Sequence, residues 1–232
     1  MNLVVPSTFK KLGEGGQGQV VQLYSNICGS CVLKTPLNDA RSEEALVREA
    51  GIMARIFCGD NLLPLLQSGI TPWGQPFVLL PQCDFSLSEL LNKEGTHLEA
   101  WTVLYIALHV ITGLMCLHIQ KLVHCDLKPD SILVSTCKIF SKASTENEVR
   151  PPVTGDRCLI ADFGMTVDEG AKVLGYTEGY FPPEGYKCGT ATTALDVYAL
   201  GVILWNLATG EVSVCLRTYF VSFFLDKAAC LI

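Results

Sequence analysis

Residues 124–131 read His-Cys-Asp-Leu-Lys-Pro-Asp-Ser, and the apolar run Ile-Leu-Val follows at 132–134. These eight residues hold an imidazole, a carboxylate and an ammonium group, and they lie between a long apolar segment and a predicted strand. Loops that rigid elements hold in place commonly carry catalytic groups. A polar surface loop with a chance arrangement of charges is the alternative, and the rest of the chain has to decide between the two.

The composition is that of a globular chain: 49% of the 232 residues are hydrophobic, 17% are charged, and the net charge is −6. A chain of this length can bury a substantial core as one large domain or as two lobes. Its weakly acidic balance, without a run of Lys or Arg, lacks the electrostatic footprint of proteins that bind nucleic acid or an anionic membrane surface. We therefore expect no nucleic-acid partner.

Two apolar runs, at 98–119 and 197–207, are the candidates for membrane spans. His109, Thr112 and Gly113 interrupt the first run, and the second is too short to cross a bilayer, so we expect buried helices and no membrane insertion. The N-terminus lacks the charged start and apolar core of a secretory signal. Eleven cysteines, of which only Cys28 and Cys31 form a C-x-x-C pair, favour reduced thiols and hence the cytoplasm, with the nucleus as the alternative.

Residues 9–35 alternate between β-rich segments and turn residues, which predicts two or three antiparallel strands. Gly13, Gly15 and Gly18 form a G-x-G-x-x-G pattern within this region. In a dinucleotide-binding oxidoreductase these glycines would open a helix, but β-branched and aromatic residues follow them at 19–24. A glycine flap between two strands, with backbone N–H groups free to approach phosphates, is therefore favoured.

A predicted strand ending at Lys34 leads into a predicted amphipathic helix at 39–56, with Leu46 and Met53 on its apolar stripe. Glu49 flanks that stripe and can turn inward, although an isolated glutamate is usually a surface residue.

The remaining chain divides into apolar and polar segments. Short apolar runs at 62–66 and 77–80 predict two more strands. Residues 99–120 are apolar on nearly all sides, as in a helix through the middle of a lobe, and a second strong helix is expected at 196–205. Between them, the polar stretch 135–157 predicts a solvated insertion.

Seven short patterns follow one another along the chain, and each alone is a weak or moderate signal. In order they are G-x-G-x-x-G-x-V ending at Val20, V-L-K ending at Lys34, a helical Glu49, H-C-D-L-K-P-D-S at 124–131, D-F-G at 162–164, P-P-E at 182–184 and D-V-Y-A-L-G-V at 196–202. Together they resemble the signature set of the eukaryotic protein kinase family, serine/threonine type.

This resemblance implies an α+β, two-lobed protein-kinase-like fold. The kinase domain would occupy residues 1–210, with a small β-rich N-lobe and one regulatory helix at about 9–81. A mainly helical C-lobe would follow at about 84–210, incomplete at its end and carrying the insertion at about 135–157. Residues 211–232 would form an atypical hydrophobic tail.

The resemblance also implies catalytic roles, because phosphoryl transfer depends on positioning and charge neutralisation. Asp126 would orient the attacking hydroxyl group and accept its proton, and Lys128 would neutralise charge that develops on the γ-phosphate. Lys34 would hold the α- and β-phosphates, with Glu49 as its ion-pair partner. Asp162 would bind Mg²⁺.

ATP and Mg²⁺ are the implied cofactors, with Mn²⁺ as an alternative metal. Ser131 stands where the family has the asparagine that binds a second metal ion, and a hydroxyl is a shorter and weaker ligand than an amide carbonyl. Reduced activity or a changed metal preference would follow. The residues that the resemblance assigns to ATP are Gly13, Gly15, Gly18, Val20, Val32, Lys34, Leu80, Cys83 and Leu133.

Two further departures from the family concern regulation and completeness. Cys125 replaces the arginine that pairs with a phosphorylated activation loop, so we expect activity that does not require phosphorylation of Thr166 or Thr177. The resemblance ends near Gly210, and the arginine that would pair with Glu184 belongs to the missing region.

The resulting hypothesis is a serine/threonine protein kinase that transfers the γ-phosphate of ATP to hydroxyl groups of protein substrates. The alternative is a nucleotide-binding pseudokinase that serves as an interaction scaffold, which Ser131 and the missing C-terminal helices favour. The joint presence of Lys34, Asp126 and Asp162 favours catalysis.

Overall fold

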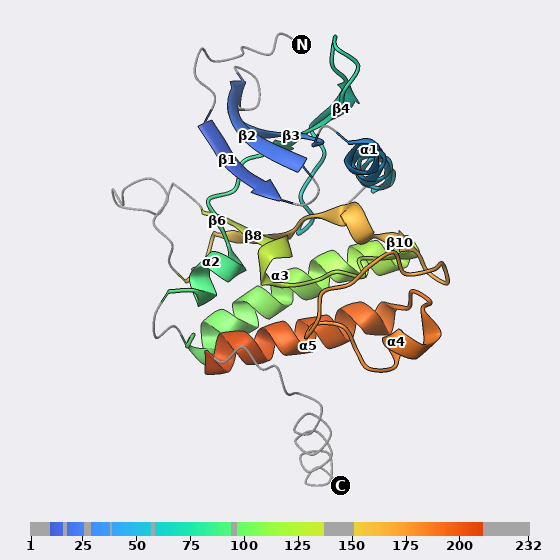
Figure 1. Ribbon diagram of the computed structural model, residues 1–232. Coiled ribbons are helices and arrows are strands. Elements are labelled where there is room, and N and C mark those ends of the chain that lie inside the picture. The colour runs from blue at the N-terminus through green and yellow to red at the C-terminus, as the bar shows by residue number, and fades with distance from the viewer. Residues whose placement is uncertain are drawn as a thin grey trace, which may run out of the picture.

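The chain folds into two lobes, a sheet with one helix above a layer of helices (Figure 1). This computed structural model describes residues 10–15, 18–25, 29–37, 39–56, 59–93, 97–136 and 151–210. The architecture is α+β and two-lobed, which confirms the fold expected from the sequence. The predicted domain start (1–9), the centre of the predicted insertion (137–150) and the predicted apolar tail (211–232) lie outside the described residues.

An antiparallel five-stranded sheet in the order β1-β2-β3-β5-β4 forms the smaller lobe. Its strands are β1 (Lys10–Gly15), β2 (Gly18–Ser25), β3 (Gly29–Thr35), β4 (Gln67–Ile70) and β5 (Pro76–Pro81). Gly18 begins β2 opposite Gly15, and a Cβ atom on Gly18 would lie 2.3 Å from the carbonyl oxygen of Thr35. Only glycine allows this close approach. The glycine run therefore opens a strand, as expected, and not a helix.

The helix α1 (Ala40–Arg55) packs against the sheet of the smaller lobe. Asp39 caps its first turn by accepting the backbone N–H of Ser42 at 2.9 Å, an arrangement that stabilises helix N-termini. Leu46, Glu49 and Met53 are buried on one face, in keeping with their spacing of three and four residues. Glu49 therefore points inward, unlike the usual surface glutamate.

The strand expected at 62–66 is absent from the described structure, and β4 forms directly after it. Leu62 makes only an isolated bridge to Ile160, and the N–H of Leu63 donates to the Ile160 carbonyl at 2.8 Å. Pro64 has no N–H to give to a ladder, which explains why the run does not continue as a strand. Leu62 and Leu63 are instead buried in hydrophobic clusters, and Leu65 and Leu66 are partly buried.

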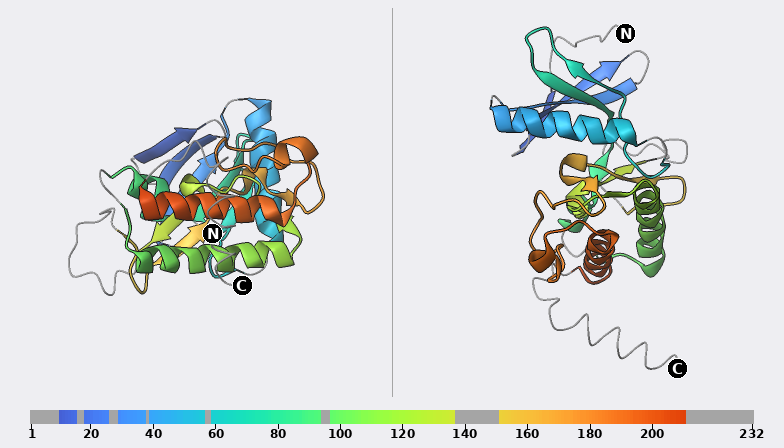
Figure 2. Two further views of the ribbon diagram at one scale, coloured as in Figure 1. Left: turned by 90° about the horizontal axis from the view of Figure 1, so that it is seen from below. Right: turned by 90° about the vertical axis from the view of Figure 1, so that its right-hand side faces the viewer.

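Two long apolar helices, α3 (Ala100–Ile119) and α5 (Thr193–Thr209), lie side by side in the larger lobe (Figures 1 and 2). Between them and the smaller lobe lie two small antiparallel sheets, one of β6, β8 and β9 and one of β7 and β10. The shorter elements are α2 (Leu87–Leu91), α4 (Gly185–Cys188), β6 (Phe85–Ser86), β7 (Leu122–Val123), β8 (Ile132–Ser135), β9 (Arg157–Ile160), β10 (Val167–Asp168) and the 3₁₀ turns η1 (Pro129–Ser131) and η2 (Phe163–Met165).

The polar and small residues that interrupt the sequence of α3 face β9. His109 Nδ1 accepts the backbone N–H of Cys158 at 3.0 Å. A Cβ atom on Gly113 would lie 2.8 Å from the carbonyl oxygen of Asn61 and 2.9 Å from the side chain of Ile160. By length and composition alone, α3 is long and apolar enough to cross a bilayer. In this structure its inner face belongs to the core of the larger lobe.

The predicted insertion at about 135–157 is described only near its two ends, and its extent stays a prediction. Ser135 and Arg157, at its two ends, face each other in the β8–β9 ladder. Asp156 is buried, and its carbonyl oxygen accepts the Tyr105 hydroxyl of α3 at 2.9 Å. The first and last residues of the polar stretch therefore belong to strands. Their backbone groups find partners in the β8–β9 ladder and, at Asp156, in the hydroxyl of Tyr105 on α3.

The close contact at Gly113 yields a stability prediction. Gly113→Ala should lower the free energy of unfolding by about 1–3 kcal/mol, since the added Cβ would collide with backbone and a core side chain. Gly51→Ala on α1 is the matched control, because nothing lies within 4 Å of its Cβ position. Alanine's better helix propensity should raise stability there by about 0.5–1 kcal/mol. Urea denaturation measures both variants, and the same sign of change in both would contradict this packing.

Candidate active site

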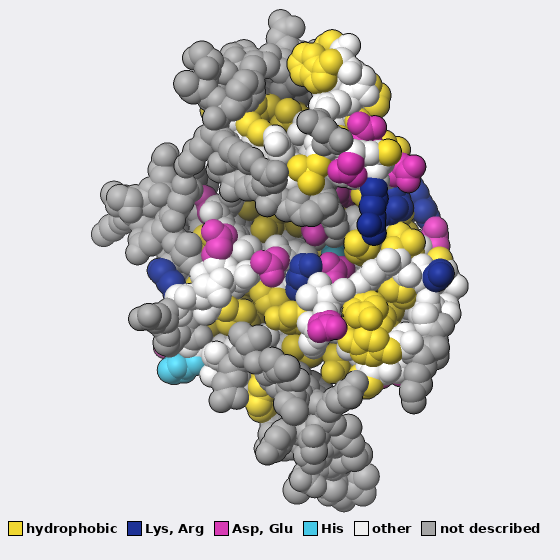
Figure 3. Space-filling view, in the orientation of Figure 1, with side chains coloured by type: hydrophobic (Ala, Val, Ile, Leu, Met, Phe, Trp, Pro, Cys, Tyr) yellow, Lys and Arg dark blue, Asp and Glu magenta, His cyan; other side chains and the backbone are white. Residues whose placement is uncertain are grey.

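A cleft of about 510 Å³ opens between the lobes. Residues of β2, β3 and β5 form one wall, and β8 with the residues after β9 forms the other. Figure 3 shows acidic and basic side chains gathered in the middle of one face of the molecule. Of the residues assigned to ATP from the sequence, the cleft is lined by Val20, Val32, Lys34, Leu80, Cys83 and Leu133.

Gly13, Gly15 and Gly18, also assigned to ATP, lie in the β1–β2 hairpin. Residues 16–17, at its turn, lie outside the described residues. Gly15 and Gly18 face each other at the ends of β1 and β2, and Gly13 faces Val20 within the ladder. Contact of these glycines with phosphates stays a prediction.

Lys34 links the two lobes inside the cleft. Its Nζ lies 2.7 Å from Glu49 Oε2 on α1 and 3.5 Å from Asp162 Oδ1 on the other lobe. Burial alone would lower the pKa of Lys34, but the two facing carboxylates outweigh it and raise this pKa, so the ammonium group stays charged at neutral pH. Burial raises the pKa of Glu49, and Lys34 opposes that effect. The charged Lys34 is thus available to an anion in the cleft.

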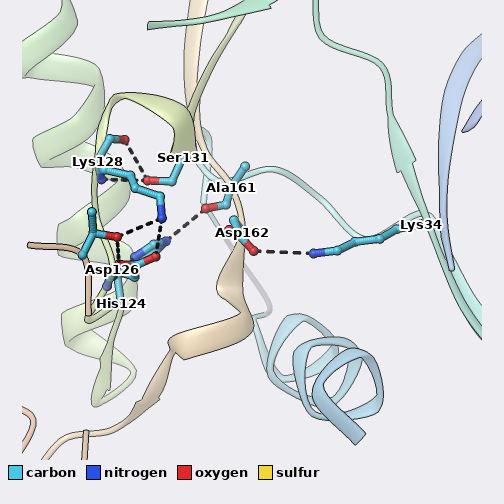
Figure 4. A network of polar contacts seen from close by, with 8 residues as sticks. Lys34, His124, Asp126, Lys128, Ser131, Ala161 and Asp162 are labelled. Carbon is cyan, nitrogen blue, oxygen red and sulfur yellow. Dashed lines mark hydrogen bonds and ion pairs between the residues drawn. The ribbon is translucent and has the colours of Figure 1, made fainter. Parts of the chain in front are cut away.

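Asp126, Lys128 and Thr177 form a compact polar triangle (Figure 4 labels the first two). Lys128 Nζ lies 2.7 Å from Asp126 Oδ2 and donates to Thr177 Oγ1 at 3.0 Å. The Thr177 hydroxyl donates in turn to Asp126 Oδ1 at 2.6 Å. Thr177, which is 49 residues from Lys128 and 51 from Asp126 along the chain, therefore adds a hydroxyl to the carboxylate and the ammonium group of the loop.

Asp196, which had no role assigned from the sequence beyond its motif, fixes the backbone of this loop. The carboxylate lies on α5, is 1% exposed, and accepts the backbone N–H groups of His124 at 2.9 Å and of Cys125 at 3.0 Å. It also lies 2.9 Å from Nε2 of His118 on α3, which must donate because an ionised carboxylate only accepts. The sequence carried one signal for this role: Asp196 is the single acidic residue in the otherwise apolar helix α5.

His124 connects the loop to the residue between β9 and Asp162. Its Nε2 lies 3.0 Å from the carbonyl oxygen of Ala161, and its Nδ1 accepts the N–H of Asp126 at 3.3 Å. These two partners fix one neutral tautomer of the ring, since a carbonyl requires a donor and an N–H an acceptor. The ring also meets Phe163 edge-on, with centroids 5.7 Å apart.

The backbone of two residues in the site is left-handed. Cys125 has φ of 66° and Asp162 has φ of 60°, a region that non-glycine residues enter only when their surroundings hold them there. Asp196 provides that restraint for Cys125. Burial raises the pKa of the Cys125 thiol to about 12, so this position carries no charge at neutral pH.

Ser131 is buried and does not line the cleft. Its hydroxyl accepts the Lys128 N–H and donates to the Lys128 carbonyl, both at 2.9 Å. The side chain therefore closes the η1 turn that carries Lys128, and its role as a metal ligand stays a prediction.

Two arginines on α1 hold the segment that follows Asp162, and neither was singled out from the sequence. Arg48 donates to the carbonyl oxygen of Gly164 at 3.2 Å. Arg55 binds both carboxylate oxygens of Asp168, at 2.5 and 3.1 Å. Such bidentate pairs fix geometry as well as charge. Through these contacts, α1 and its Glu49 are tied to the loop that carries Asp162.

The donor set of the cleft fits a nucleotide polyphosphate with a magnesium ion. Asp162 lines the cleft and its side chain is 37% exposed. Mg²⁺ is usually held by one or two carboxylates together with phosphate oxygens and water. Among the described residues no group of three or more His, Cys, Asp or Glu side chains could hold a metal.

The chain is similar to known protein kinases of several kinds. It is 27% identical over 217 residues to the serine/threonine-protein kinase mos of Patiria pectinifera, a match that covers 86% of this chain. It is 29% identical over 203 residues to the tyrosine-protein kinase Abl of Drosophila melanogaster, again over 86% of this chain. It is 35% identical over 160 residues to the receptor-like kinase TMK2 of Arabidopsis thaliana, over 60% of this chain.

These matches span 56%, 12% and 16% of the lengths of the three relatives, respectively. A family model described as the protein kinase domain matches residues 7–219, which is most of the chain. The match includes every residue of the cleft and the catalytic loop described above. The chain belongs to the protein kinase domain family.

Proposed function

We propose that this chain is an ATP- and Mg²⁺-dependent protein kinase domain that phosphorylates serine and threonine hydroxyl groups of proteins. The observation that carries the proposal is the convergence of Lys34, Asp126 and Asp162 on one interlobe region, from three separate parts of the chain. A scaffold that only bound nucleotide would have no need of Asp126 and Lys128 held beside each other at 2.7 Å.

In the proposed reaction the substrate hydroxyl donates its hydrogen bond to Asp126. The hydroxyl oxygen attacks the γ-phosphorus of ATP, the bond from that phosphorus to the β-phosphate oxygen breaks, and the proton passes to Asp126. Lys128 lies beside the same carboxylate and can neutralise charge on the transferred phosphoryl group. Lys34 holds the phosphates that leave as ADP. Mg²⁺, when bound at Asp162, supplies additional charge neutralisation on the phosphates.

The serine/threonine assignment rests on Lys128 and Thr177. Lys128 follows the proposed catalytic base by two residues, and Thr177 bridges the base and this lysine with bonds of 2.6 and 3.0 Å. The resemblance associates this pair with the serine/threonine branch. The relatives include kinases named for tyrosine and for serine/threonine, so the acceptor residue belongs to the proposal.

We also propose a cytoplasmic location. Cys83, Cys125 and Cys158 are free thiols in the described structure, as expected in a reducing compartment.

The second candidate function is a nucleotide-binding scaffold without catalysis. Ser131 favours it, because the hydroxyl that replaces the expected asparagine is buried and already bonded in both directions to the Lys128 backbone. A site with one metal-binding carboxylate could then bind ATP without transferring its phosphate efficiently.

Replacing the proposed base separates the two functions. Asp126→Asn should lower the rate of phosphate transfer from ATP to a protein substrate by about 10²–10⁴-fold, while ATP still raises the melting temperature. The control is Asp60→Asn, which removes an exposed carboxylate outside the cleft and should keep wild-type activity. A wild-type chain that binds ATP but transfers no phosphate would support the scaffold. Phosphotyrosine as the main product would contradict the serine/threonine assignment.

The arginine contacts of α1 predict activity without activation-loop phosphorylation. Phosphatase treatment should leave the rate unchanged, because carboxylate Asp168 already supplies the anion that Arg55 binds. Arg55→Ala and Asp168→Ala should each lower kcat/KM by about 2–5-fold, which is the range of an exposed bidentate pair. The double variant should have the same kcat/KM as either single variant, because both substitutions remove the same contact.

Lys121→Ala is the matched control for these variants. It breaks an exposed ion pair of 3.1 Å to Glu169, the residue after Asp168. Its kcat/KM should stay at the wild-type value, and an equal loss in this control would show that α1 is not the element being positioned. A large loss of activity after phosphatase treatment would refute the prediction.

A further inference from the structure

Three aromatic rings form a compact cluster in the segment that begins just before Thr177. The rings of Tyr176 and Phe181 are stacked, with centroids 4.5 Å apart and an angle of 18° between their planes. The ring of Tyr186 on α4 stands at 86° to Tyr176 and at 80° to Phe181, with its centroid 4.9 and 5.1 Å from theirs. We call these three residues the aromatic corner.

The two tyrosine rings of the corner are open to solvent, although they are large. Tyr176 is 46% and Tyr186 is 45% exposed, whereas Phe181 is 6% exposed. Because Phe181 covers one face of the Tyr176 ring, the exposed surface of Tyr176 belongs to the opposite face and to the ring edge. Two exposed rings at nearly a right angle therefore offer π surface to a ligand.

The corner has a fixed position relative to the proposed base, Asp126. Phe181 packs in one buried cluster with Cys125, which directly precedes Asp126. Tyr176 directly precedes Thr177, whose hydroxyl donates to Asp126 at 2.6 Å. Consecutive Cα atoms in a chain lie about 3.8 Å apart. A substrate residue one or two places from a hydroxyl bound at Asp126 can therefore reach the corner.

The charge around the corner favours a cation. Between Tyr176 and Tyr186 the chain contains two carboxylates, Glu178 and Glu184, and no Lys or Arg. Both glutamates are exposed, and neither is paired with a cation among the described residues. The faces of aromatic rings carry negative electrostatic potential and attract cations. An anionic side chain would meet repulsion at this place, and a planar guanidinium group suits both the rings and the carboxylates.

We propose that the aromatic corner is a specificity site that binds an arginine side chain of the protein substrate, one or two residues from the phosphorylated serine or threonine. This inference rests on the function proposed above. The guanidinium group stacks on an exposed tyrosine ring, and the aliphatic stem of the arginine covers the ring edge. None of the three aromatic residues lines the nucleotide cleft, so the corner selects the protein substrate and not the nucleotide.

Steady-state kinetics with a peptide series tests the proposal. Each peptide carries one serine in an alanine and glycine background, and one residue is varied at the two positions before and the two positions after it. At one of these positions arginine should raise kcat/KM about 3–10-fold over alanine, chiefly through a lower KM, as expected of a partly exposed cation–π contact. Citrulline keeps the shape of arginine without its charge and should behave like alanine.

The other outcomes of this series separate the corner from the function on which it rests. Equal rates for all peptides would overturn the corner and leave the kinase function intact. A higher kcat/KM with leucine or glutamate than with arginine would show that the corner does not select a cation. Absence of phosphate transfer to every peptide, alanine peptides included, would count against the function and the inference together.

Two variants of Tyr186 locate the preference. Tyr186→Leu removes one ring and should lower the ratio of kcat/KM for the arginine and alanine peptides to roughly half its wild-type value or less, whereas Tyr186→Phe keeps the ring and should preserve the ratio. Tyr24→Leu is the matched control, because Tyr24 is 58% exposed on β2 of the other lobe, and it should keep the wild-type ratio. Melting curves with and without ATP verify that each variant is folded. An unchanged ratio in folded Tyr186→Leu would overturn the assignment.

Discussion

The buried carboxylate of Asp196 is the interaction on which the arrangement of this site depends. Burying an ionised carboxylate is costly unless several donors satisfy it, and here the donors are the backbone N–H groups of His124 and Cys125 and the ring of His118. Because these groups come from the catalytic loop and α3, satisfying one charge joins both to α5. The loop can then hold Asp126 in a fixed direction without help from a bound ligand.

From this anchor a continuous chain of polar contacts crosses the molecule. His124 contacts the carbonyl oxygen of Ala161, directly before Asp162, Asp162 faces Lys34, and Lys34 is paired with Glu49 on α1. These links are buried or partly buried, so the low local dielectric strengthens them. The two lobes are thereby aligned through the same residues that would handle the phosphates, which joins the stability of the fold to its proposed chemistry.

The sequence predicted what periodicity and order along the chain encode: the strands around the glycine run, the amphipathic α1, the apolar α3 and α5, and the residues that meet in the cleft. It missed what depends on contacts distant in sequence. Nothing local identifies Arg55 as the partner of Asp168, 113 residues away. The run 62–66 has the composition of a strand, but tertiary contacts with Ile160 use its backbone differently. Ser131 is buried by the turn that it closes, which a comparison of residue types does not show.

The central claim, that the buried charge of Asp196 holds the catalytic loop in place, is tested most directly by steady-state kinetics of Asp196→Asn. The substitution keeps the size of the side chain but replaces one acceptor oxygen by an NH₂ group. This group then faces the N–H donors that the carboxylate had accepted. The account predicts a fall in kcat of about 10-fold or more with KM for ATP close to the wild-type value, since the nucleotide cleft is built from other residues. An unchanged kcat in a folded variant would contradict it.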